Sequence, residues 1–67
     1  MIQMRLHMLM AEKRITQKQL SEETGIRQPT ISAYYNETYK HIVKEHIEIL
    51  CNYFECDLSD LIKYNRD

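Results

Sequence analysis

The feature that most constrains this chain is its near-total lack of helix breakers. It contains one glycine and one proline, Gly25 and Pro29, which stand four residues apart. Glycine and proline are the residues that most strongly disfavour helix interiors, so the rest of the 67-residue chain is free to form helices. The sequence therefore predicts an all-α fold of one small domain, residues 1–67, with a sharp turn near Gly25.

Apolar residues recur at helical spacing on both sides of this turn, and helix-end signals separate them. Thr16 followed by Gln19 fits a capping box, and Gly25 stands where a left-handed helix end is expected. Pro29 falls in the first turn of the next helix, and Asp57 is placed to cap a last short helix. The sequence predicts a compact bundle of five helices at residues 2–13, about 17–24, about 28–35, 43–54 and 58 to about 64. Its expected radius of gyration is about 11 Å.

The segment from residue 16 to residue 36 has the organisation of a helix-turn-helix. Two short helices flank the turn at Gly25, and small or apolar contact residues let the helices cross steeply. If Ile31 faces inward, the outer face of its helix, at about residues 28–35, is small and polar. Such a face can enter a DNA major groove, which is about 12 Å wide.

Two stretches, ITQKQLSEETGIRQPTIS and ILCNYFECDLSDLI, resemble the Cro/repressor-type helix-turn-helix family, also called the XRE family, and the resemblance covers roughly residues 2–64. It implies a five-helix, lambda-repressor-like bundle, often dimeric, whose third helix reads operator DNA. By this resemblance the chain is a sequence-specific regulator that binds double-stranded DNA. Repression through occupation of an operator is the default mode.

The resemblance also assigns roles to individual positions. Gln17, at the start of the second helix, would contact a phosphate, because free N–H groups there favour an anion. The base-reading residues would be Gln28, Pro29, Ser32 and Ala33, and a glutamine amide can pair with adenine N7 and N6. The DNA backbone would be met by Arg27, Asn36 and Lys40.

Five positions depart from the family pattern. Ser21 stands where alanine is usual, and Thr24 and Tyr34 stand where aliphatic residues are usual. Arg27 replaces a helix-capping Ser or Thr, a loss of about 1 kcal/mol, although an arginine there can contact phosphate. Glu37 stands where glycine is common, and we expect it near the DNA backbone, where its charge is unfavourable.

The charge of the chain is low and uneven. The net charge is −1 and the pI about 6.3, which argues against a strongly basic nucleic-acid binder. Residues 1–40 carry six Lys or Arg against four Glu, whereas residues 41–67 carry three basic against six acidic residues. We therefore expect an anion to bind to residues 1–40 and not to residues 41–67. This balance keeps an alternative open, a protein-interaction module on the same fold, such as an antitoxin-like subunit, with weak or no DNA binding.

No other chemistry stands out in the sequence. The spacing of His46, Cys51 and Cys56 does not match the Cys-x2-Cys pattern of zinc sites, so we expect core cysteines and no metal or cofactor. His7 and His41 are expected in solvent. No catalytic set, small-molecule site, secretory signal or membrane-length apolar run is visible. We therefore expect a non-enzymatic protein of the reducing cytoplasm.

Two apolar stripes are left over from the predicted core. Met4 and Met8 fall opposite the core face of the first helix, and Ile49 and Tyr53 fall opposite that of the fourth. Monomers seldom leave such patches open, although scattered exposed hydrophobic residues are normal. We therefore expect these four residues to contact a second copy in a homodimer, or a different partner protein.

Overall fold

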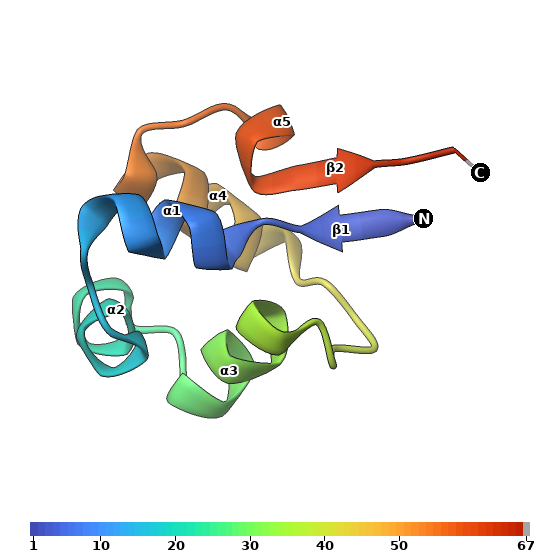
Figure 1. Cartoon of the computed structure of the whole chain (residues 1–67). Coiled ribbons are helices and arrows are strands. Elements are labelled where there is room, and N and C mark those ends of the chain that lie inside the picture. The colour runs from blue at the N-terminus through green and yellow to red at the C-terminus, as the bar shows by residue number, and fades with distance from the viewer. Residues whose placement is uncertain (67) are drawn as a thin grey trace.

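The computed structural model describes residues 1–66 and confirms the all-α, five-helix bundle (Figure 1). In chain order the elements are β1 (Ile2–Met4), α1 (Leu6–Lys13), α2 (Gln17–Thr24), α3 (Gln28–Asn36), α4 (Lys44–Phe54), α5 (Leu58–Leu61) and β2 (Ile62–Tyr64). The radius of gyration is 11.1 Å, as expected from the chain length. In the described part of the chain, no helix combines the length and the apolar character needed to cross a membrane.

The predicted outer ends of the first and last helices are wrong. Residues 2–4 and 62–64 form a two-stranded antiparallel ribbon, in which Ile2 pairs with Tyr64 and Met4 with Ile62. The N–H of Arg5 extends this pairing by donating to the carbonyl of Leu61 at 2.7 Å. Both segments alternate apolar and polar side chains, which suits a strand. The prediction of helix at residues 2–4 and 62–64 is wrong because each segment pairs with a strand about sixty residues away in the sequence.

The core joins every helix to the first strand. Nine apolar side chains are buried: Met4, Leu6, Met10, Leu20, Ile26, Ile31, Tyr34, Leu50 and Leu61. Met4 is fully buried, so the prediction that it lies on an exposed contact surface is wrong. Met4 lies at the end of β1 nearest the bundle, paired with the half-buried Ile62, whereas Ile2 at the outer end of the ribbon is exposed.

Left-handed residues end most of the helices. Gly25 has φ +80°, which confirms the predicted helix end, and non-glycine residues with positive φ follow α1, α3 and α4 at Arg14, Glu37 and Glu55. A side chain in this region costs roughly 1–2 kcal/mol. Three of the helix ends therefore use a strained residue where glycine would be relaxed.

Candidate nucleic-acid interface

The first part of the candidate interface is the start of α2. The capping box is confirmed: the Gln19 N–H donates to Thr16 Oγ1 at 3.1 Å, and the Thr16 N–H donates to Gln19 Oε1 at 3.0 Å. Gln17, the first residue of α2, is half-buried. It lines a hollow of about 220 Å³ together with Tyr35 and His7. The cap thus fixes the position of Gln17 at the positive end of α2.

Side-chain hydroxyls close the turn between α2 and α3. The Gly25 N–H donates to the Ser21 carbonyl at 2.9 Å. Ser21 Oγ donates to the Ile26 carbonyl at 2.6 Å, and Thr24 Oγ1 donates to the Leu20 carbonyl at 2.6 Å. The Ile26 N–H in turn donates to Thr24 Oγ1 at 3.2 Å. The two departures from the family pattern in α2 therefore add hydrogen bonds to the turn, a role that the sequence analysis missed.

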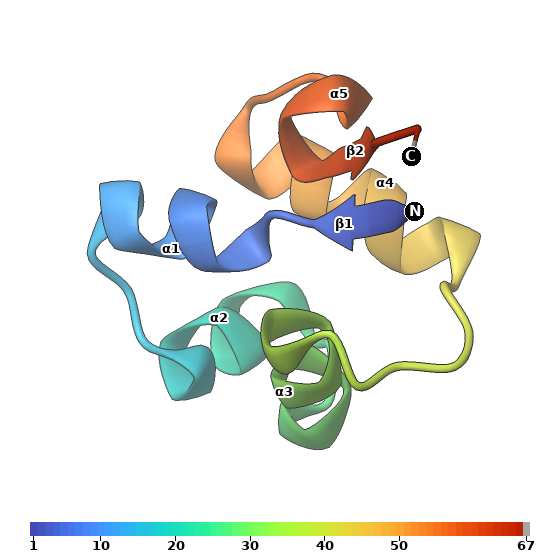
Figure 2. The ribbon, with the colours of Figure 1, turned by 45° about the vertical axis from the view of Figure 1, so that its right-hand side comes forward.

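Helix α3 presents the expected face to solvent. Ile31 and Tyr34 are buried, while Gln28 and Pro29 are exposed and Ser32 and Ala33 are half-buried. Arg27, the residue before the helix, makes no capping hydrogen bond with its side chain, as predicted. Figure 2 shows α2 and α3 together along one side of the molecule, away from α5. The small outer face of α3 is therefore open to contact with a large ligand.

A shallow hollow opens between α3 and the loop that follows it. Its volume is about 360 Å³. It is lined by Pro29, Thr30, Ala33, Tyr34, Tyr39, Lys40, His41, Val43 and His46. Lys40 is the one lysine or arginine among these lining residues and none of them is acidic, although the nearby charge of Glu37 acts on the lining residue Tyr39.

The chain matches one known protein family over most of its length. A family model described as a Cro/C1-type HTH DNA-binding domain matches residues 5–67. The chain belongs to the Cro/C1-type HTH DNA-binding domain family. No curated protein matches it. The matched range begins after β1, so the first strand of the ribbon lies outside the part of this Cro/C1-type domain that the family model covers.

The end of α3 differs from the expectation for a Cro/C1-type domain. Glu37 has φ +56°, which explains why glycine suits this position, and its carboxylate accepts a hydrogen bond from the Met4 N–H at 2.8 Å. The amide of Asn36 donates to the carbonyl and the hydroxyl of Ser32 at 3.0 and 3.3 Å. The side chain of Glu37 therefore binds the ribbon, and Asn36 uses its amide nitrogen within α3.

The buried residue Tyr34 connects α3 of this Cro/C1-type domain to α4. Its hydroxyl lies 2.9 Å from Nδ1 of His46 and accepts a hydrogen bond from the Val43 N–H at 3.3 Å. Beside it, burial raises the pKa of Tyr39, and the negative charge of Glu37 raises it further. This connection was not predicted from the sequence, in which its only signal is a tyrosine where an aliphatic residue is usual.

Three residues remain from the predicted dimer or partner contact, and their exposure differs: Met8, Ile49 and Tyr53. Met8 is exposed, and its sulfur accepts hydrogen bonds from the Arg5 guanidinium at 3.1 and 3.3 Å. Ile49 is also exposed. Tyr53 is half-buried: the Lys13 ammonium lies 4.4 Å from its ring centre, and its hydroxyl donates to Glu23 at 2.9 Å. Tyr53 therefore has partners within the domain.

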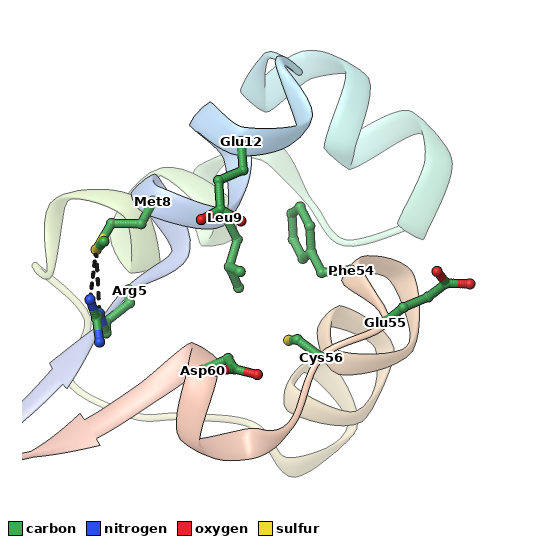
Figure 3. A pocket seen from close by; sticks show the side chains of 8 residues that line it. All are labelled: Arg5, Met8, Leu9, Glu12, Phe54, Glu55, Cys56 and Asp60. Atoms are coloured by element: carbon green, nitrogen blue, oxygen red, sulfur yellow. Dashed lines mark hydrogen bonds between the residues drawn. The ribbon is translucent and has the colours of Figure 1, made fainter.

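Both cysteines of this Cro/C1-type domain are free and half-buried. Figure 3 shows Cys56 facing a hollow of about 350 Å³ that Arg5, Leu9 and Phe54 also line. Burial, followed by the neighbouring Cys51, raises the pKa of the Cys56 thiol to about 11. Among residues 1–66, no three His, Cys, Asp or Glu side chains are grouped closely enough to hold a metal ion.

Proposed function

We propose that the protein is a sequence-specific DNA-binding regulator that reads the major groove with α3 and represses transcription by occupying an operator. The observation that carries the proposal is the outer face of α3 in a chain of the Cro/C1-type family: its side chains are small apart from Gln28, with Gln28 and Pro29 exposed and Ser32 and Ala33 half-buried. Occupying an operator needs only the helix-turn-helix domain itself, with residues 16–36 as its DNA-binding core. The role is non-enzymatic, and the two free cysteines suit a reducing cytoplasm.

Gln28 is the base-reading residue with the clearest chemistry in this proposal. It is exposed at the start of α3, and its amide can donate to and accept from one adenine edge. Pro29, Ser32 and Ala33 are small enough to let the helix approach the bases. The phosphate contacts come from residues on either side of this face: Gln17, Arg27, Asn36 and Lys40.

Selection of bound duplexes from a random pool, followed by titration, tests this function. Gln28→Ala should relax the preference at one base pair and cost about 1–3 kcal/mol at the selected site. Lys40→Ala should weaken binding to all sequences alike. Gln3→Ala, a glutamine on β1, is the matched control and should leave the selected motif unchanged. Failure of the wild-type protein to enrich any motif would favour the alternative function, a protein-interaction module.

We also propose that the regulator binds DNA as a homodimer. A single module with a net charge of −1 has little nonspecific attraction to DNA, and linking two modules raises their effective concentration. The proposed contact uses Met8, Ile49 and the remaining exposed part of Tyr53. A symmetric dimer would place two α3 helices about 34 Å apart and require a palindromic site.

Sedimentation at micromolar concentration tests the dimer. Ile49→Glu should shift a dimer towards the 8.1 kDa monomer and weaken operator binding, because it buries a charge in the contact. Glu48→Gln, beside it on α4, is the control. A wild-type protein that sediments as a monomer with and without operator would exclude the homodimer.

A further inference from the structure

Tyr34 does more than fill the core. It is the largest of the fully buried side chains, and its ring packs edge-on against Tyr39 at 5.7 Å and His46 at 5.8 Å. Its hydroxyl nevertheless reaches two groups on the far side of the loop between α3 and α4, the His46 ring and the Val43 backbone. A phenylalanine would make the same ring contacts without these bonds.

One arrangement of hydrogen atoms lets the Tyr34 hydroxyl serve both of its partners. The Val43 N–H can only donate, so Tyr34 Oη is its acceptor. The single proton of the hydroxyl is then free for Nδ1 of His46, 2.9 Å away. When Nδ1 accepts, the neutral imidazole carries its own proton on Nε2. The contact with Tyr34 thus holds the orientation of the His46 ring, and in this arrangement the proton of the ring lies on Nε2.

The connection also fixes the far end of the loop. Val43 is the residue before α4 and makes no capping bond with its side chain, while Glu37, at the near end, is held by its bond to the Met4 N–H. Between these two ends lie Lys40 and His41, both exposed and both lining the hollow beside α3. The loop therefore presents its basic side chains from a backbone that is tied at each end.

We propose that Tyr34 is a positioning residue, whose hydroxyl shapes the hollow between α3 and the loop so that it receives one DNA backbone phosphate. Lys40, His41 and the N–H of His46 are the donors to that phosphate. Pro29 and Ala33, which line the same hollow, belong to the base-reading face, so a phosphate bound there also sets how α3 enters the groove. This inference rests on the proposed DNA-binding function.

A double-mutant cycle between Tyr34→Phe and Lys40→Ala tests the inference on a selected duplex. Tyr34→Phe should weaken binding about 2- to 10-fold, the range that corresponds to one ordinary hydrogen bond. Each variant should lower the slope of log affinity against log salt by up to about 1, because one phosphate contact is lost or loosened. In the Lys40→Ala background, Tyr34→Phe should have no further effect beyond about 2-fold.

Tyr64→Phe is the matched control, because it also removes a tyrosine hydroxyl, from a residue exposed on β2 that does not line the hollow. It should leave both the affinity and the salt slope unchanged. If Tyr34→Phe fails to fold, His46→Phe removes the partner of the Tyr34 hydroxyl together with one proposed phosphate donor, and its loss of affinity should shrink in the Lys40→Ala background.

Additive effects of Tyr34→Phe and Lys40→Ala, or a Tyr34→Phe variant with lower thermal stability but an unchanged salt slope, would reduce Tyr34 to a structural residue. In those cases the wild-type protein still selects its duplex, and the proposed function stands. If the wild-type protein selects no duplex, both the proposed function and this inference are wrong.

Discussion

Replacing Glu37 by glycine sets two effects of known size against each other. Glu37 has φ +56°, a conformation that costs a non-glycine residue roughly 1–2 kcal/mol. Glycine relieves that strain, but about 0.4–1 kcal/mol is lost again because glycine makes the unfolded chain more flexible. Against the net gain of about 0.5–1 kcal/mol stands the hydrogen bond from the Met4 N–H to the Glu37 carboxylate.

That bond is partly buried and has a charged acceptor, a class worth about 1.5–3 kcal/mol. Because the bond is only partly shielded, the lower end of this range applies, and Glu37→Gly should lower the free energy of unfolding by about 0.5–1 kcal/mol. Glu55 supplies the matched control: it has φ +52°, and its side chain makes no hydrogen bond within residues 1–66. Glu55→Gly should therefore raise the free energy of unfolding by about 0.5–1 kcal/mol.

Thermal unfolding followed by circular dichroism measures both changes. In a domain of this size, 1 kcal/mol corresponds to about 4–8 °C in Tm, so the two variants should shift in opposite directions by amounts that are easily resolved. Equal stabilisation by Glu37→Gly and Glu55→Gly would refute the reasoning, because the bond between Glu37 and Met4 would then contribute nothing.

Three further predictions concern the turn, the core and the thiols. Gly25→Val should lower the free energy of unfolding by more than ~1 kcal/mol, whereas Gly25→Asn should lower it much less. A Cβ added at Gly25 meets no atom within 4 Å, so unfolding curves of the two variants report backbone strain alone. Met4→Ala should cost about 2–5 kcal/mol in chemical denaturation, while the exposed Met8 should tolerate the same change, and equal losses would contradict the burial of Met4. With its pKa raised to about 11, Cys56 should react slowly with iodoacetamide at pH 8 and faster as the pH rises towards 11, because only the thiolate attacks; rapid mass-detected alkylation at pH 8 would contradict this.

The helix ends could be predicted because their signals are local. Thr16 and Gln19 form the expected capping box, and Gly25 has the expected positive φ. In each case the residues that interact lie within one turn of helix, so a short window of sequence contains the whole interaction. The outward face of α3 was predictable for the same reason, since the burial of Ile31 fixes the direction of its neighbours.

The ribbon and the connection through Tyr34 could not be predicted, because their partners are distant in sequence. Ile2 fits a helix as well as a strand until its pairing with Tyr64 is known. The hydroxyl of Tyr34 acts through His46, twelve residues further along the chain. A pattern within one segment shows that a side chain is inward, but it does not show which group the polar tip of that side chain will meet.

The ribbon also holds the first and last strands of the domain together, like a clasp. Its two strands, residues 2–4 and 62–64, lie side by side and extend from the bundle on the side away from α2 (Figure 1). A tag or fused domain attached at either end would therefore emerge from one common exit. Because β1 also delivers Met4 to the core, trimming the chain to the matched residues 5–67 would open the clasp and remove a buried side chain in the same cut.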